Sequence, residues 1–344
     1  MLLALVLLLQ LVLPVGAVVW LGWRTPLSWA GFWVHVLTSV LLILATALAG
    51  LWTALPWWLP LAYAVALLLV GAAVYGSGNL PERRWPAAIA EELHLALCIA
   101  LALFSLVHLA YAGVSRLRVA HESVDLDFPL PVGDYLVADA GQPDRVHAAQ
   151  SIAQRMTRLS VWGDQSAGVD IVRVNDWGLR AAGLLPSEPA AYFIFGTPVL
   201  APCDGNVDAL RADRPDRPVP HTDRGSATGN YVLLRCTSAV VLLANLRANS
   251  IMVARDERVT SGTPIAAVGN SGLSDEPHLH IQAMRSGSAR QSAQGDAFVS
   301  TPLAIRFNGR APQRNERISV FADHAAHADH GTAPVSDQAT AAGN

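Results

Sequence analysis

Hydrophobic positions follow two different patterns along this chain. The first part consists of four almost uninterrupted apolar segments, Met1–Trp23, Leu27–Leu51, Trp57–Tyr75 and Ala87–Ala112. Each is near or above the ~20 residues that a helix needs to cross a bilayer. We therefore expect about four membrane-spanning helices, with the lipid bilayer as a partner. The first segment is also compatible with a cleaved signal peptide, although it lacks a positively charged start and three further spans follow it.

The second part, from about Ala120, has short β-prone runs separated by Gly, Asn and Asp. This pattern is typical of a mainly antiparallel β domain. The predicted strands are Ala167–Val174, Thr197–Leu200, Asn206–Val207, Tyr231–Cys236, Ala239–Leu246, Ile251–Val253 and Thr263–Val268. A short helix is predicted over His147–Leu159. The stretch Arg211–Gly225 has no apolar period, and we interpret it as a solvated insertion or, alternatively, the wall of a groove.

These two patterns predict the domain organisation. We expect transmembrane helices over residues 1–114, a linker over 115–135, a β domain over 136–310 and a disordered tail over 311–344. Its last part, Asp323–Asn344, is small, polar and rich in Ala and Thr, which argues against a packed core. The fold class is thus an N-terminal α-helical transmembrane region followed by a mainly antiparallel β domain.

Composition and charge agree with a membrane protein. The chain has 344 residues, 52% of them hydrophobic, and a mean hydropathy of +0.34, which is too apolar for an ordinary soluble domain. Because the chain has no lysine, its orientation depends on arginine. With the N-terminus outside, Arg24, Arg83 and Arg84 lie in cytoplasmic loops and Arg116 and Arg118 lie outside. This three-to-two balance favours a periplasmic or extracellular β domain on a multi-pass protein of the bacterial inner membrane.

Several tryptophans and ionisable side chains in the apolar region are candidates for particular functions. The tryptophans near the span ends, at positions 20, 23, 29, 33, 52, 57, 58 and 85, are predicted to be membrane-interface anchors. Ionisable groups at membrane depth are functional candidates by default, and Glu91, Glu92, His94 and His108 lie in the fourth segment. Burial within a helix bundle is the alternative interpretation for the histidines.

Three cysteines bear on the compartment. Cys98 lies in the fourth apolar segment, whereas Cys203 and Cys236 lie on predicted neighbouring strands. In an oxidising periplasm the latter two could form a disulfide, and in a reducing compartment they would be buried thiols. Neither belongs to a Cys-x-x-Cys metal motif.

The clearest chemistry lies between Gly269 and Ile281. A turn-forming Gly-Asn-Ser-Gly cluster leads into His278-Leu279-His280-Ile281, whose polar and apolar residues alternate as in a strand. Because side chains on a strand repeat with period two, His278 and His280 are predicted to share one face and Leu279 and Ile281 the other. Two imidazoles on one face can serve as a zinc ligand and as a proton acceptor beside the metal.

Four motifs occur in an order that resembles a known family. They are the Gly-Thr-Pro-Val stretch from Gly196 to Val207, Gly229–Val232, Val259–Gly272 and Pro277–His280. Together they resemble the LytM/lysostaphin-type zinc metallopeptidases, peptidase family M23, over about Ala167–Met284. This resemblance implies a small antiparallel β-fold with a groove and a Zn²⁺ held by His, Asp and His. It also implies hydrolysis of peptide bonds in bacterial cell-wall peptidoglycan.

The resemblance assigns functions to individual residues. Asp170 and His280 match zinc ligands, and His278 matches the catalytic histidine. The family's first histidine ligand precedes the aspartate by four positions, where this chain has Ser166. We therefore take His147 as the third ligand, with His221 as the alternative.

A second departure from the family concerns Asn245. The stretch Leu242–Leu246 aligns with the family's Tyr-Ala-His-Leu, so that Asn245 replaces a histidine that stabilises the transition state. An amide can donate a hydrogen bond to a developing oxyanion, but it cannot carry a positive charge.

These observations leave hypotheses of different classes. The first is a membrane-anchored zinc metalloendopeptidase that acts on peptidoglycan peptides. The second is a non-catalytic module of the same family that binds the cell wall or a regulatory protein partner and controls another hydrolase. In a third, the helices transport or sense a ligand and the β domain is accessory. We expect no nucleic-acid partner.

Overall fold

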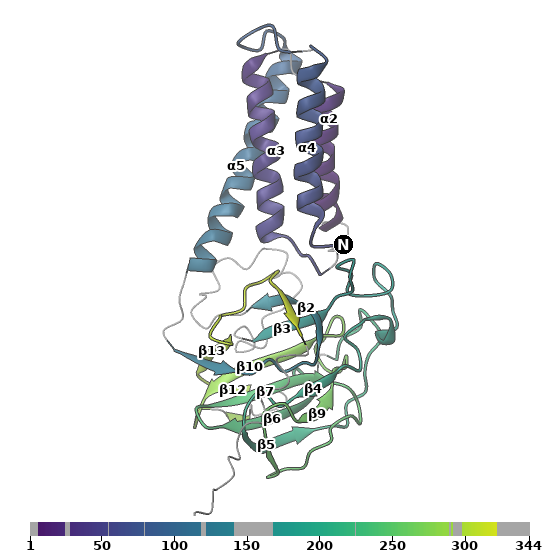
Figure 1. Cartoon of the computed structure of the whole chain (residues 1–344), viewed down its shortest axis with the longest axis vertical. Helices are drawn as coiled ribbons and strands as arrows, with labels where there is room; N and C mark the ends of the chain where they lie inside the picture. The colour runs from purple at the N-terminus through teal and green to yellow at the C-terminus, as the bar shows by residue number, and fades with distance from the viewer. Residues whose placement is uncertain are drawn as a thin grey trace, which may run out of the picture.

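The structure is a computed structural model that describes residues 6–24, 28–53, 55–78, 80–117, 122–140, 168–223, 225–288, 290–291 and 298–321. A column of long helices stands on a β domain, and the chain first runs through the helices and then enters the sheet (Figure 1). The predicted helix at 147–159 lies outside the described residues.

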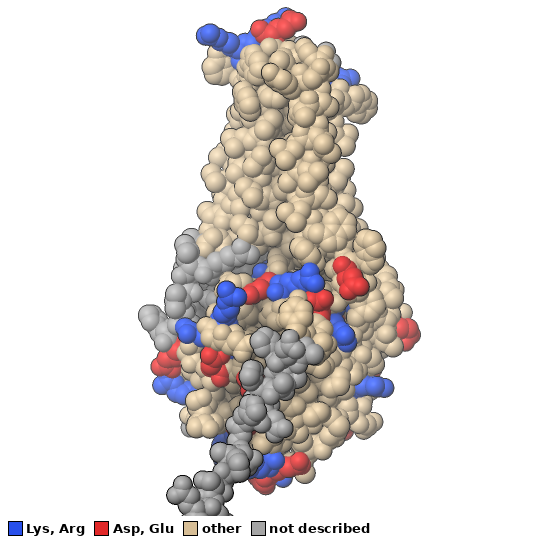
Figure 2. All heavy atoms as spheres, in the orientation of Figure 1, with Lys and Arg blue, Asp and Glu red and all other residues tan. Residues whose placement is uncertain are grey.

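The helical part contains η1 Leu8–Val12, α2 Leu13–Trp23, α3 Trp29–Ala49, α4 Leu59–Gly76 and α5 Ile89–Leu117. Among the described residues, three helices are long and apolar enough to cross a membrane, over Trp29–Ala49, Leu59–Gly76 and Ile89–Ala110, and a shorter apolar helix covers Leu8–Trp23. Figure 2 shows charged side chains at the far end of the column and on the β domain, with an uncharged surface between them. The predicted helical region is therefore present.

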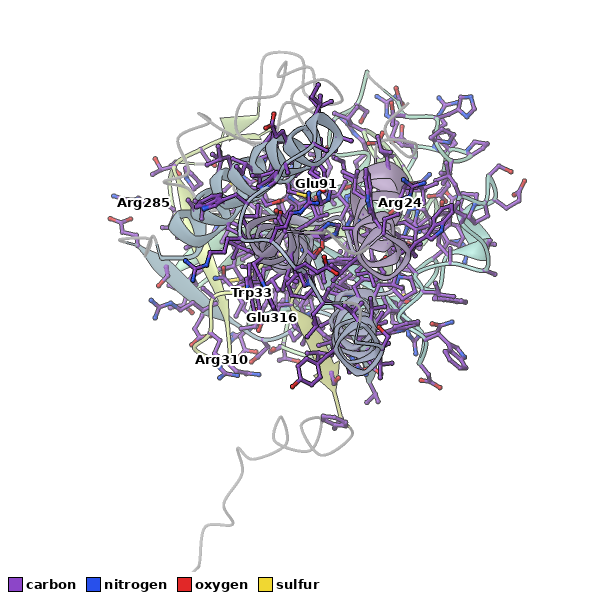
Figure 3. All side chains as sticks on the ribbon, turned by 90° about the horizontal axis from the view of Figure 1, so that it is seen from above. Arg24, Trp33, Glu91, Arg285, Arg310 and Glu316 are labelled. Atoms are coloured by element: carbon purple, nitrogen blue, oxygen red, sulfur yellow. A yellow bond between two sulfur atoms is a disulfide. The ribbon has the colours of Figure 1, made fainter. Side chains whose placement is uncertain are left out.

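Charged side chains of both signs lie at the bundle end away from the β domain. Arg83 and Arg84 lie at the end away from the β domain, because their carbonyls accept hydrogen bonds from the first residues of α3, Trp29 and Ala30. Glu91 and Glu92 lie in the first turn of α5, where a carboxylate is favourable, and Glu91 caps the backbone of Ala87. Seen from that end, Arg24 and Glu91 lie over the helices, with Arg285 and Arg310 at the periphery (Figure 3).

The β domain is built on one sheet with the order β14-β2-β3-β10-β7-β6-β5-β8, to which β13 and β1 are added beside β10. Its strands are β1 Ser123–Leu126, β2 Gly133–Ala140, β3 Val169–Arg173, β5 Gly205–Arg211, β6 Asn230–Cys236, β7 Ala239–Leu246, β8 Arg258–Val259, β10 Leu279–Arg285, β13 Pro302–Phe307 and β14 Arg317–Val320. Two small ladders pair β4 Pro198–Leu200 with β9 Pro264–Ala267 and β11 Arg290–Gln291 with β12 Phe298–Val299. The described pairs are antiparallel except β1 with β13, so the predicted fold class is confirmed.

One predicted strand is wrong. Ile251–Val253 belongs to no ladder, although Met252 donates its backbone N–H to the Ile265 carbonyl at 2.9 Å. Ile251 and Val253 are half-buried against the core. These residues are therefore apolar because they pack against the core, although the segment does not pair as a strand.

The Arg211–Gly225 region is not a simple solvated insertion. Its Asp216 carboxylate accepts hydrogen bonds from the backbone N–H groups of Asn270 at 2.6 Å and Ala248 at 3.1 Å. Val219 is buried. Charge and proline content predicted exposure, but one carboxylate satisfies backbone donors of two neighbouring turns and holds the loop against them.

Cys203 and Cys236 form a disulfide, the first of the two alternatives that the sequence left open. It joins the segment after β4 to the end of β6, and its Cα atoms lie 6.1 Å apart. Cys98 is buried and is the free cysteine.

The helical part contacts the sheet through the connection between α3 and α4. Trp52 and Leu55 pack with Leu136, Val172 and Val174 in one apolar cluster. Two hydrogen bonds accompany this contact, from Trp58 Nε1 to the Trp177 carbonyl at 2.9 Å and from Asn315 Nδ2 to the Gly50 carbonyl at 2.8 Å.

Trp52 is only 2% exposed, so its predicted function as a membrane-interface anchor is wrong. The tryptophans at positions 20, 23, 33 and 85 are exposed, as such anchors require.

We predict that Gly272→Ala lowers the free energy of unfolding more than Gly262→Ala. Both glycines have φ of +80°, which costs a residue with a Cβ about 1–2 kcal/mol. A Cβ at Gly272 would meet the Gly229 nitrogen at 2.4 Å, whereas a Cβ at Gly262 meets nothing within 4 Å. Thermal unfolding of the detergent-solubilised chain measures the difference. Equal losses of unfolding free energy in the two variants would contradict the close contact between the backbones at Gly272 and Gly229.

Candidate metal centre in the β domain

Two adjacent antiparallel strands bring the candidate ligands together. In the register of β3 and β10, His280 lies directly opposite Asp170. The His280 imidazole donates from Nδ1 to Asp170 Oδ1 at 2.7 Å. His278 precedes β10 by one residue, and its Nε2 lies 3.7 Å from the same carboxylate oxygen. The predicted common face of the two histidines is thus present, and Asp170 has the partner that its burial requires.

The tautomer of His278 is fixed by a backbone carbonyl. Its Nδ1 lies 2.8 Å from the Glu276 carbonyl oxygen and 3.2 Å from Ser274 Oγ. Because a carbonyl can only accept, Nδ1 must carry the proton. Nε2 of the neutral ring therefore presents its lone pair on the side of Asp170, where it can bind a metal or accept a proton.

The donor set of this cluster fits a metal ion. One ligand atom from each of Asp170, His278 and His280 lies within 4.8 Å of the others, and the group combines one carboxylate with two imidazoles. Asp170 and His280 are 8% and 7% exposed. His280 Nε2 is buried without a hydrogen-bond partner among the described residues. A carboxylate and imidazoles in a nearly dry site are typical ligands of zinc.

Gly168 gives the His280 ring its space. A Cβ at position 168 would lie 2.2 Å from His280 Cε1 and 2.5 Å from Nε2. The backbone before β3 therefore passes directly against the imidazole. A rigid, buried ring has no alternative position that avoids such a clash.

A polar network holds the turn before β10. Asn270 donates from Nδ2 to the Arg217 carbonyl at 2.6 Å, and its Oδ1 accepts from Ser274 Oγ at 2.7 Å. Both side chains are fully buried. Because Ser274 Oγ also approaches His278 Nδ1, the network positions the residues that orient the His278 ring.

Arg180 and Glu276 form an ion pair that the sequence analysis missed. Arg180 is 6% exposed, and its Nε and Nη2 lie 2.8 and 2.7 Å from the Glu276 carboxylate. Its guanidinium lies 5.5 Å from the Tyr192 ring centre. Burial, and then the Glu276 charge, raise the pKa of Tyr192 to about 12, against the opposing effect of Arg180. Because the Glu276 carbonyl accepts the hydrogen bond from His278 Nδ1, this ion pair also holds the histidine in place.

Asn245 has a structural bond in addition to its predicted catalytic function. Its backbone has φ of +60°, a conformation that Asn tolerates better than most residues. Its side-chain amide donates to the Ser271 carbonyl at 2.9 Å, and its own carbonyl accepts from the Gly269 N–H at 3.0 Å. One of the two amide N–H groups is thus engaged with the turn before β10.

The two candidates for a third ligand are placed differently. His147 and Ser166 lie outside the described residues. His221 is exposed on the loop after β5, and within the described part of the chain it does not belong to the group around Asp170. The structure therefore brings together Asp170, His278 and His280 of the predicted site residues.

Comparison with known proteins identifies a family match within the β domain. Residues 192–292 match the family model described as Peptidase family M23, and this segment contains Asn245, His278 and His280. The chain thus carries an M23 peptidase domain over that range, with Asp170 upstream of it. No curated protein matches the chain.

Several solved structures are similar to this chain. A mutant catalytic domain of the prophage-encoded M23 protein EnpA from Enterococcus faecalis has 17% identity and a TM-score of 0.25, covering 39% of this chain and 74% of that one. The lysostaphin catalytic domain from Staphylococcus simulans has 20% identity and a TM-score of 0.24, covering 39% and 73%. A zinc-containing peptidase from Vibrio cholerae has 18% identity and a TM-score of 0.27, covering 51% of this chain and 40% of its own.

We predict that Arg180→Met lowers the free energy of unfolding by about 3 kcal/mol, because it leaves a largely buried carboxylate without its partner. The matched control is Arg235→Met, which removes an exposed partner of Asp208 and should cost less than about 1 kcal/mol. Chemical denaturation of both variants measures these losses. A cost for Arg180→Met no larger than that of the control would show that the pair does not hold this loop.

Proposed function

We propose that this chain is a membrane-anchored zinc metallopeptidase of the M23 type that hydrolyses peptide bonds of bacterial cell-wall peptidoglycan. The observation that carries the proposal is the convergence of His280 and His278 on the Asp170 carboxylate. Both histidines lie in the segment that matches Peptidase family M23. Lysostaphin, a similar structure, is described as an antimicrobial peptidase.

Asp170 and His280 would hold the zinc ion, with His147 as the proposed third ligand. When bound, zinc supplies a Lewis acid that activates water near neutral pH and polarises the scissile carbonyl. The protein contributes the buried Asp170 carboxylate and the His280 imidazole, which the register of β3 and β10 places opposite each other. His221 remains the alternative third ligand.

His278 would act as the general base and then as the general acid. Its Nδ1–H group donates a hydrogen bond to the Glu276 carbonyl, so Nε2 is the atom that would accept a proton from the attacking water. The same atom then returns this proton to the leaving amine. The second N–H of the Asn245 amide would donate to the oxyanion that develops on the scissile carbonyl.

The proposed location is the bacterial inner membrane, with the β domain in the periplasm or outside the cell. Arg24, Arg83 and Arg84 lie at the bundle end opposite the sheet, and positive residues favour the cytoplasmic side. The Cys203–Cys236 disulfide is typical of an oxidising compartment. Both features support the same orientation.

A specific observation favours the second function, a non-catalytic module that binds the cell wall or a regulatory partner. Ser166 stands where the family has a histidine ligand, and the Asn245 amide is bonded to Ser271. A protein that binds zinc and peptidoglycan without releasing new amino groups would have this function.

The test of the proposed function is digestion of purified peptidoglycan by the zinc-loaded full chain in detergent, measured as newly released amino groups. We expect His278→Gln to retain zinc but lose at least about a hundredfold in rate, because proton transfer by a positioned side chain contributes about 10²–10⁴-fold. His280→Gln should lose both zinc and activity. Activity of His278→Gln equal to that of the natural chain would overturn the assignment of the base.

We further predict that Gly168→Ala abolishes zinc binding, because the added methyl group displaces the His280 ring. The matched control is Gly225→Ala, whose Cβ makes only an ordinary 3.4 Å contact with Asp223. Elemental analysis of the two purified variants gives the zinc content. Full zinc content in Gly168→Ala would remove His280 from the ligand set.

A further inference from the structure

A second cluster of metal-ligating side chains lies between α3 and α5, within the apolar helical part. His35 Nδ1 lies 2.9 Å from His94 Nε2, and Cys98 Sγ lies 3.4 Å from the same His94 nitrogen. These ligand atoms all lie within 4.8 Å of one another. His35 and Cys98 are 3% and 5% exposed, and His94 is half-buried. His35 comes six residues after Trp29, the first residue of α3, and therefore lies about 9 Å along the helix axis from it.

The surrounding backbone prepares His35 as a ligand. Its Nε2 lies 2.8 Å from the Ala17 carbonyl of α2, which can only accept, so this nitrogen carries the proton. Nδ1 therefore presents a lone pair to His94 and Cys98. A hydrogen bond that fixes the tautomer and direction of a histidine in this way is characteristic of metal-ligating imidazoles.

Further contacts hold the rings and the backbone around these donors. His94 and Cys98 are four residues apart on α5, a spacing that places them on one helical face. The Trp20 ring lies 5.2 Å from His94, and Thr38 donates to the Cys98 carbonyl at 2.9 Å. Ser39 donates to the His35 carbonyl at 3.0 Å. Three helices thus hold the donors in place.

We infer that His35, His94 and Cys98 form a binding site for a singly charged thiophilic cation, Cu⁺. Donors around one ion are about 3.5 Å apart for metal bonds of about 2.0–2.3 Å. The separations of 2.9 and 3.4 Å from His94 Nε2 to the other two donors are close to this spacing. A thiolate with two imidazoles is a soft donor set that suits copper and zinc. In an apolar bundle the charge decides between them. Cu⁺ with one thiolate and two neutral imidazoles is neutral, whereas Zn²⁺ would leave an uncompensated positive charge.

The protons and charges are balanced when Cu⁺ binds to these three residues. The Cys98 thiol loses one proton to solvent as its sulfur bonds to Cu⁺. The His94 proton moves from Nε2, where it is shared with His35 in the ion-free form, to Nδ1. Neither copper nor sulfur changes oxidation state.

The experiment is Cu⁺ loading of the full chain in detergent under a mild, disulfide-sparing reductant, followed by competition with a Cu⁺ chelator. We expect one retained copper per chain and an affinity at least about tenfold lower in Cys98→Ser and in His35→Gln, since even outer-shell changes cost about 10–100-fold. His108→Gln is the matched control on α5, because its Nδ1 is bonded to the Phe104 carbonyl of its own helix. His280→Gln controls for the β-domain cluster.

Copper affinity in Cys98→Ser equal to that of the natural chain would overturn the site, and so would copper lost in His280→Gln. X-ray absorption at the copper edge tests it without any variant. One sulfur and two nitrogen neighbours are expected, and a shell of nitrogen and oxygen alone would refute the assignment. A preference for Zn²⁺ over Cu⁺ at Cys98 would also contradict it.

Discussion

The antiparallel pairing of β3 with β10 is the constraint on which the candidate centre depends. This register sets His280 opposite Asp170 and leaves Ile281 opposite Val169 in the core. Because successive side chains alternate between faces, a slip of one residue would bury the histidine in the apolar core and expose the core residues. The burial of Leu279, Ile281 and Ala283 therefore enforces the same register that brings the ligands together.

The face of β3 that carries Asp170 also contacts the helical part. Val172 follows Asp170 at the strand period and packs, together with Val174, against Trp52 and Leu55 from the connection between α3 and α4. The helices are thus joined to the sheet through the strand that supplies a candidate ligand. The helical part therefore packs against the same strand that supplies Asp170, and this contact supports the geometry of the site.

The elements that follow from local sequence patterns could be predicted from the sequence. The long apolar helices follow from continuous apolar runs, β6 and β7 follow from β-branched and leucine-rich runs, and the common face of His278 and His280 follows from the strand period. The Ile251–Val253 prediction failed because an apolar run reports burial and does not require a pairing partner. The charge and proline content of Arg211–Gly225 likewise predicted a solvated stretch and gave no sign that Asp216 bonds to the Asn270 backbone.

The parts that could not be predicted are contacts between distant segments. Arg180 and Glu276 are 96 positions apart, and neither residue lies in a recognisable motif. His35 and His94 are 59 positions apart and meet only because α3 and α5 pack together. The Asn245 side chain gave a sequence signal, its substitution for a histidine, but its bond to Ser271 depends on how two turns meet.

The most direct measurement is zinc-edge X-ray absorption on the full chain purified in detergent, compared with His280→Gln. A centre formed by Asp170 and His280 requires bound zinc with a shell of nitrogen and oxygen neighbours, and loss of that zinc in the variant. Absence of zinc from the natural chain, zinc retained with an unchanged spectrum in His280→Gln, or a sulfur neighbour that points to Cys98 would contradict it.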